Sequence, residues 1–207
     1  MHYYTIHLTP ILNMNLISYT EDYYLESAIS HMIFASEIEN ITDTMDKKSV
    51  DSLFDHIILF NDKKPSDNLL LLSNCHDFKP GDKILVISDI VTVEIIGRFI
   101  REQCELMVKS IKSIVPNGLV AFMFRPYEKE NVFLCGTHYK PLLTRTEKTF
   151  LQSLRTAQAN QELIKKLKTK TASSHKRNIM RKMGMLHTQA LLSYINTTSF
   201  PHVLAHL

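Results

Sequence analysis

The stretch TASSHKRNIMRKMG, residues 171–184, separates two kinds of side chain when it is placed on a helix. At about 100° per residue, one side collects residues suited to packing: Ala172, His175, Ile179 and Met183. The opposite side collects cations and a hydroxyl: Lys170, Ser174, Arg177 and Arg181. The major groove of B-DNA admits one α-helix, and short polar and basic side chains bind base edges there. The stretch therefore fits a DNA-binding helix. A single charged helix is more often a basic surface helix, but the rest of this chain argues against that interpretation.

Positive charge is concentrated around this helix. Residues 143–186 contain eleven Lys or Arg and two acids, and residues 187–207 contain none of these four residue types. The whole chain has 24 bases and 21 acids, so the first 142 residues hold 13 bases and 19 acids. This asymmetry indicates a polyanion-binding unit joined to a part that does not bind polyanions. An anionic membrane could also attract the cations, but the aromatic anchors of an interfacial helix are missing there.

Composition limits the class of protein further. A chain of 207 residues suits one large domain or two small ones. No apolar run approaches the roughly 18 residues of a membrane span, and the N-terminus lacks the pattern of a secretory signal. The cysteines Cys75, Cys104 and Cys135 are odd in number and far apart, so we expect reduced thiols in the cytoplasm. The histidines form no cluster with cysteines or acids, so we expect no metal site and no cofactor.

The first 125 residues alternate short apolar runs with amphipathic segments. Continuous β-branched runs separated by helices indicate a parallel sheet that is covered on both faces, here an α/β sandwich of five β-α units. The predicted strands are residues 14–18, 38–42, 56–60, 83–88 and 105–109. The predicted helices are residues 21–35, 49–54, 65–74, 91–103 and 117–124.

Residues 126–142 show no sustained period and predict a linker. An all-α domain is expected over residues 143–207. Thr144 and Glu147 have the spacing of a capping box at the start of its first helix, and Gly184 is a plausible end of the third. The second helix is expected at residues 160–168, the third at 171–184 and the fourth at 188–197. Two short helices joined by a tight turn, the second carrying the cations, predict a helix-turn-helix.

The fourth predicted helix has an apolar side that could serve either of two purposes. It could pack within the domain or pair with a second copy of the chain. The residues concerned are Ala190, Leu191, Tyr194 and Ile195.

Several residues of this helical part match a known family in order. They are Leu143-Thr144-x-x-Glu147, Phe150-Leu151, Asn160-x-Glu162 and Thr171-Ala-Ser-Ser-His175-x-x-x-Ile179-x-x-Lys182-Met183-Gly184. On these residues the last third of the chain resembles the C-terminal domain of LuxR-type (NarL/FixJ) helix-turn-helix transcription regulators. The portion from Ser173 to Lys182 most resembles the capsule-synthesis co-regulators of enteric bacteria. The chain departs from the family near Ala157, where a Gly is usual, and at the small Ala172.

The resemblance implies roles for individual side chains. It places Ser173, Ser174 and Arg177 toward bases, and Lys170 and Lys176 toward phosphate. The histidine of the family corresponds to His175, whose place on the apolar side favours packing. The full predicted DNA-binding set is Lys170, Thr171, Ser173, Ser174, Lys176, Arg177, Arg181 and Lys182.

A dimer is the expected binding form. One recognition helix covers only a few base pairs, so two copies would bind two half-sites of double-stranded DNA. The resemblance implies either a homodimer or a heterodimer with another LuxR-type regulator.

The N-terminal part then resembles a response-regulator receiver, of the flavodoxin-like fold. Phosphoryl transfer to a receiver needs an acidic pair, an Asp nucleophile, a hydroxyl and a Lys at the ends of successive strands. The acidic pair could be Glu21 with Asp22, or the register could place Thr20 and Glu21 there; Ser88 and Lys109 fit the last two roles. The nucleophile position falls on Phe60 or Asn61, with Asp62 just beyond in a loop. We therefore expect a receiver-like domain that acts without phosphorylation.

These observations favour a sequence-specific transcription regulator that is not an enzyme. The alternative is an interaction protein whose N-terminal sheet binds a partner while the basic part holds nucleic acid without sequence preference. An enzyme of the flavodoxin-like fold is disfavoured, because the chain has no Gly-rich phosphate loop and no nucleophile-base-acid set.

Overall fold

The computed structural model describes residues 4–8, 14–24, 26–31, 54–75, 77–110, 133–136, 140–157 and 170–207. The chain divides into two compact units that interleave along the sequence. The sheet unit comprises Met1–Asn61, Phe78–Asp89 and Gln103–Leu134. The helical unit comprises Asp62–Asp77, Ile90–Glu102 and Cys135–Leu207.

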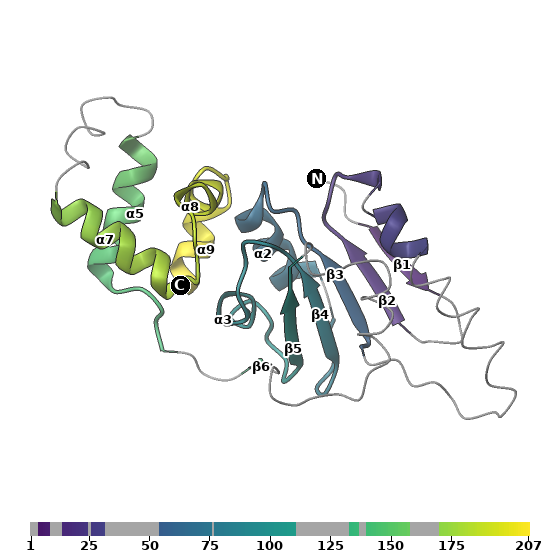
Figure 1. The fold of residues 1–207 in the computed structure, drawn as a ribbon. Coiled ribbons are helices and arrows are strands. Elements are labelled where there is room, and N and C mark those ends of the chain that lie inside the picture. Colours follow the sequence, from purple (N-terminus) through teal and green to yellow (C-terminus); the bar gives the residue numbers. More distant parts are fainter. Residues whose placement is uncertain are drawn as a thin grey trace, which may run out of the picture. The chain divides into compact units, whose positions relative to one another are not determined.

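The sheet unit is built on a six-stranded sheet in the order β1-β2-β3-β4-β5-β6 (Figure 1). Its four central strands are parallel, and both edge strands are antiparallel to their neighbours. The central strands are β2 (Met14–Ser18), β3 (His56–Leu59), β4 (Lys83–Ile87) and β5 (Glu105–Lys109). The edge strands are β1 (Tyr4–Leu8) and β6 (Phe133–Leu134).

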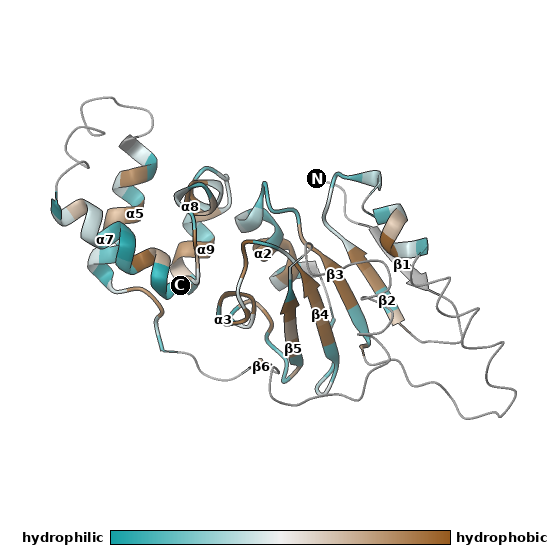
Figure 2. Ribbon diagram, in the orientation of Figure 1, coloured by the Kyte–Doolittle hydropathy of each residue, from teal (hydrophilic) through white to brown (hydrophobic). Residues whose placement is uncertain are grey.

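Apolar, largely β-branched residues hold the centre of this sheet. Ile57 and Ile58 are both fully buried, as are Val86 and Ile87. Successive side chains of a strand point to opposite faces, so both faces of the sheet are covered. Figure 2 shows this apolar character as brown colour over the middle of β3, β4 and β5. The predictions of strands at 14–18, 56–60, 83–88 and 105–109 are therefore confirmed to within one residue.

The prediction of a purely parallel sheet is wrong at both edges. Only five residues separate β1 from β2, and such a short link allows antiparallel pairing, whereas a parallel crossover needs a dozen or more residues. β6 falls within the predicted linker at 126–142 and pairs with β5. β2 is thus paired on both sides, antiparallel to β1 and parallel to β3.

Among the helices predicted in the first half of the chain, some are confirmed and one is shorter than predicted. The helix at 65–74 is confirmed as α2 (Pro65–Cys75), and residues 23–24 and 26–31 are helical within the predicted 21–35. The helix at 91–103 is wrong in length, because α3 covers only Val93–Ile96. Gly97 follows it, and the chain then tightens into turns in which Arg98 and Phe99 donate to carbonyls three residues back. The strand predicted at 38–42 and the helix at 117–124 lie outside the described residues.

The helical unit contains four further helices. They are α5 (Arg145–Ala157), α7 (Lys170–Lys182), α8 (Thr188–Ile195) and α9 (Phe200–His206). Helix α5 packs against α7 and α8, while α2 packs against α8 and α9. The helices predicted to begin at 144, 171 and 188 are thus present. The one predicted at 160–168 lies outside the described residues.

Sequence reasoning missed α9, although its signal is present. Phe200, Val203, Leu204 and Leu207 follow the spacing of one helix face, and all four are buried. Pro201 obscures the pattern, but proline in a first helical turn costs no hydrogen bond. The end of the chain is tied to the start of this part, because Leu143 N donates to Leu207 O at 2.8 Å.

Helix α8 uses its apolar side within the helical unit. Leu191, Tyr194 and Ile195 are each at most 1% exposed. The Ser66 hydroxyl of α2 donates to the Tyr194 carbonyl at 2.9 Å, and Ser199 N donates to Asp67 at 3.2 Å. Of the two purposes left open by the sequence, these residues serve packing and are not exposed for pairing with a second copy.

The Tyr194 phenol gives a test of this packing. Its hydroxyl is buried and has no hydrogen-bond partner among the residues that the structure describes. Burial raises the pKa of the phenol, and the charge of Asp62 raises it further, so the group is neutral. We expect Tyr194→Phe to leave the free energy of unfolding unchanged or raise it by about 1 kcal/mol, since an unsatisfied buried polar group is costly.

Ser66→Ala is the matched control, measured by the same urea unfolding. It removes a hydroxyl that does have a partner, so we expect a loss of about 1 kcal/mol. An equal loss in Tyr194→Phe would show that the phenol is hydrogen-bonded.

Candidate nucleic-acid interface

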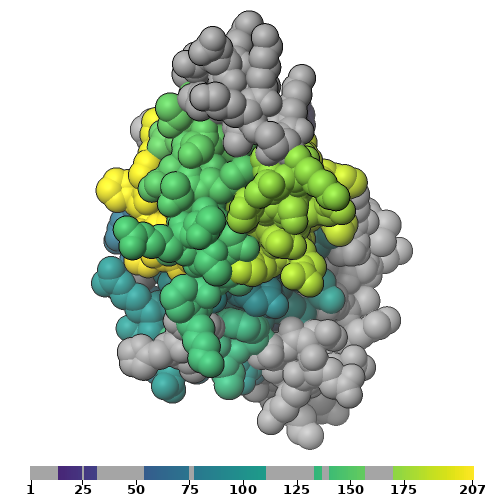
Figure 3. All heavy atoms as spheres, turned by 90° about the vertical axis from the view of Figure 1, so that its left-hand side faces the viewer, coloured from purple at the N-terminus to yellow at the C-terminus, as the bar shows by residue number. Residues whose placement is uncertain are grey.

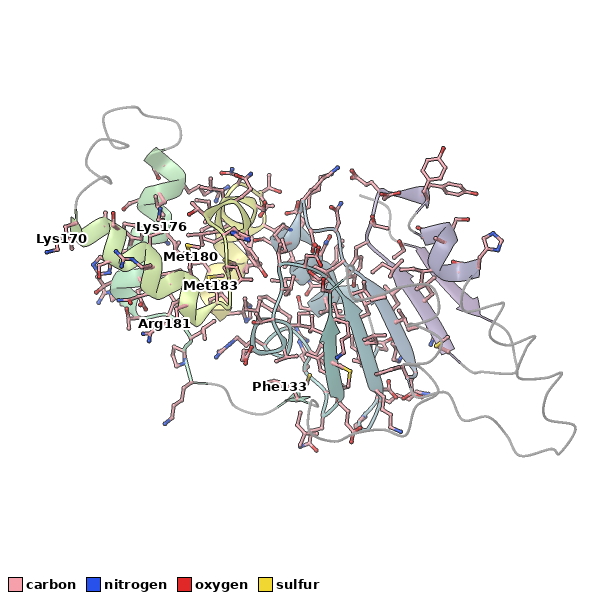
Figure 4. All side chains as sticks on the ribbon, in the orientation of Figure 1. Phe133, Lys170, Lys176, Met180, Arg181 and Met183 are labelled. Carbon is pink, nitrogen blue, oxygen red and sulfur yellow. The ribbon has the colours of Figure 1, made fainter. Side chains whose placement is uncertain are left out.

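Helix α7 has the two faces that its sequence predicts. Ala172, Ile179 and Met183 are buried, and α7 packs on α5 through this side. Figure 3 shows the two helices side by side, α5 in green and α7 in yellow-green. On the opposite side every residue of the predicted stripe is exposed: Lys170, Ser174, Arg177 and Arg181. This stripe, called the cationic stripe below, runs the length of the helix from Lys170 to Arg181 (Figure 4).

The remaining predicted site residues lie beside the cationic stripe. Thr171 is exposed, and Ser173 and Lys176 are half-buried on the flanks. Lys182 is also half-buried, and its ammonium contacts Glu147. Sequence reasoning passed over Asn178, which is exposed and shares a flank with Thr171. The angular position of Asn178 around the helix axis follows from the sequence alone. An Asn side chain can form paired hydrogen bonds with adenine.

His175 packs instead of joining the cationic stripe. Its ring lies 5.6 Å from the Phe150 ring, with an angle of 34° between the two planes. Phe150 belongs to α5, so this contact joins the middle of α5 to the middle of α7. The packing role expected for His175 is confirmed.

The end of α7 is set by Gly184. Its φ of +66° is in the left-handed region, which glycine adopts without the steric cost of a side chain. Met185 N donates to Met180 O at 2.8 Å and Gly184 N to Arg181 O at 3.3 Å. These two bonds are the Schellman motif, which satisfies the last carbonyls of a helix. The predicted stop at Gly184 is therefore confirmed.

Gly184→Ala tests this end. A methyl group there would clash with the methyl group of Thr92, and the left-handed backbone costs an L residue about 1–2 kcal/mol. We expect a loss of at least that size in the free energy of unfolding, measured by urea denaturation. Adding Thr92→Ser to this variant removes the clashing methyl group and should recover only part of the loss. Full recovery would mean that the backbone conformation costs nothing.

The start of α5 is a capping box, as its spacing predicts. Thr144 N donates to Glu147 Oε2 at 2.8 Å, and Glu147 N donates to Thr144 Oγ1 at 3.3 Å. Lys182 Nζ donates to the same Oε2 at 2.7 Å. Burial raises the pKa of the Glu147 carboxyl, but the hydrogen bonds from Lys182 and Thr144 outweigh it, and the net pKa lies below its ordinary value.

This lowered pKa gives a pH dependence of known sign. A carboxyl with a depressed folded-state pKa stabilises the fold above its unfolded-state pKa, and loses this contribution as pH falls through the folded value. We expect Glu147→Gln to lower the free energy of unfolding by about 1–3 kcal/mol at pH 7. The difference from the unchanged protein should shrink below the ordinary pKa of 4.5. A difference that is constant from pH 7 to pH 3 would contradict the lowered pKa.

The residues considered for a receiver site lie after the central strands of the sheet. Phe60 and Asn61, the two residues considered for the nucleophile, follow β3 and are buried. Ser88 is buried after β4, and its N donates to Lys109 O at 2.9 Å. Asp62 lies in the turn before α2. Within the described part of the chain, no group of three His, Cys, Asp or Glu is placed to hold a metal ion.

Comparison with protein-family models, with curated proteins and with solved structures finds no match for this chain. Among the described residues, no helix combines the length and apolar character needed to cross a membrane.

Proposed function

We propose that this protein is a sequence-specific DNA-binding transcription regulator that inserts the cationic stripe of α7 into the major groove. The observation that carries the proposal is that Ala172 and Ile179 of α7, and Met183 directly after it, are buried while the whole cationic stripe is exposed. The resemblance of the last third of the chain to LuxR-type regulators supports the same assignment.

Two kinds of contact would contribute. Lys170 and Lys176 would neutralise phosphates, which gives affinity that falls steeply with salt. Ser174 and Arg177 would face base edges, and each good pair of that kind contributes about 1–3 kcal/mol of discrimination. Because α7 carries no acidic residue, nothing on the helix itself repels the duplex.

We further propose that the protein acts as a dimer, with itself or with another regulator of the family. Two half-sites are needed because one helix spans only a few base pairs. Since the apolar side of α8 is buried in the helical unit, the pairing surface lies elsewhere in this conformation.

The deciding experiment is selection of preferred duplexes by the full chain from a random pool. The recovered duplex is then titrated against a random one at physiological salt. A regulator binds the recovered sequence at least about a thousandfold more tightly. Equal affinity for both would support the alternative, an interaction protein that holds nucleic acid without sequence preference.

Arg177→Ala locates the binding face. We expect it to weaken binding to the recovered duplex by about 1–3 kcal/mol and to relax preference at one position of the site. Arg101→Ala is the matched control, because Arg101 is also exposed but lies outside α7. If the two variants bind alike in fluorescence anisotropy titrations, the assigned face is wrong.

A further inference from the structure

Glu147 belongs to α5 but also holds α7. It is 6% exposed, and its Oε2 atom accepts three hydrogen bonds. Two come from Thr144, from its N at 2.8 Å and its Oγ1 at 3.0 Å. The third comes from Lys182 Nζ at 2.7 Å. One carboxylate oxygen therefore closes the first turn of α5 and binds the last turn of α7.

The ion pair between Lys182 and Glu147 supplies a directional restraint on α7, which its apolar packing lacks. Contacts of Ile179 and Met183 are non-directional, and they tolerate small rotations of a helix about its axis. A charge-assisted hydrogen bond has a defined distance and direction. The His175–Phe150 ring contact fixes the middle of α7, and Lys182 fixes its C-terminal end. Two separated points determine how far the helix is rotated.

Rotation matters because the cationic stripe is narrow. Each residue advances about 100° around the axis, so a modest turn moves Arg177 away from the bases it would contact. Lys182 is the immediate neighbour of Arg181, the last residue of the cationic stripe. A bond that holds Lys182 inward therefore holds Arg181 outward.

We infer that Glu147 is a positioning residue for the cationic stripe, and that Lys182 acts by binding Glu147 and makes no contact with DNA. This inference rests on the proposed function. It revises the predicted DNA-binding set, because the ammonium of Lys182 is committed to a buried carboxylate. It also assigns sequence preference partly to a side chain on α5.

The test compares Lys182→Met with Arg181→Met in the full chain, using the recovered and random duplexes at several salt concentrations. Both variants lose one cation from adjacent positions of α7. For Lys182→Met we expect an unchanged salt slope and at least a tenfold lower ratio of affinities for the two duplexes. For Arg181→Met we expect the dependence of log affinity on log salt concentration to become shallower by the amount that one phosphate contact contributes. A reduced slope in Lys182→Met would show that Lys182 touches phosphate and would overturn the inference.

Two further variants separate positioning from simple stability. Thr144→Ala weakens the capping box but leaves the ion pair, so we expect lower stability with an unchanged affinity ratio. Lys182→Arg keeps a cation that can donate to Glu147 and should retain the ratio of the unchanged protein. If Thr144→Ala lowers the ratio as much as Lys182→Met does, the effect is general destabilisation and the inference is wrong.

A measurement without DNA keeps the inference separate from the proposed function. Hydrogen–deuterium exchange of residues 170–182 in the free protein should be faster in Glu147→Gln and Lys182→Met, and unchanged in Arg181→Met. If the unchanged protein prefers no duplex, the proposed function fails, while this comparison still decides whether the pair holds α7. Equal exchange in all three variants would overturn the inference.

Discussion

The burial of one side of α7 against α5 is the constraint on which the candidate site depends. Ile179 and Met183 are fully buried, and the residues on the opposite side of the helix are exposed. A helix with cations on all sides could not be held in this way, because a buried charge needs a partner. Lys182, which contacts α5, has such a partner, the Glu147 carboxylate. Packing and charge therefore select the same exposed side.

The cap, the ion pair and the Schellman motif form a connected system at one end of the helical unit. Glu147 joins the first turn of α5 to the last turn of α7, and Gly184 ends α7 two residues after Lys182. The chain then enters α8, whose apolar side is covered by its own unit. The geometry of α7 is thus determined from its last turn and from its middle, by directional contacts at both places.

Features that depend on residues close together in the sequence could be predicted, whereas features that depend on distant partners could not. The spacing of Thr144 and Glu147 was sufficient for the cap, and helical periodicity was sufficient for both faces of α7, because these depend only on residues a few positions apart. Partners distant in sequence could not be predicted: the pairing of β6 with β5, and the contact between Glu147 and Lys182. No pattern within a short window shows which two elements will meet.

The composition of the helical unit has a practical consequence for dissecting the molecule. Helix α2 precedes the C-terminal helices by some seventy residues, yet its Ser66 and Asp67 supply hydrogen bonds to α8 and to the residue before α9. A fragment starting at Leu143 would omit those donors and acceptors and would uncover the parts of α8 and α9 that pack against α2. Such a fragment would expose an aggregation-prone apolar surface that is buried in the intact chain. Biochemistry on the isolated C-terminal third would therefore describe a different surface from the one the whole protein presents.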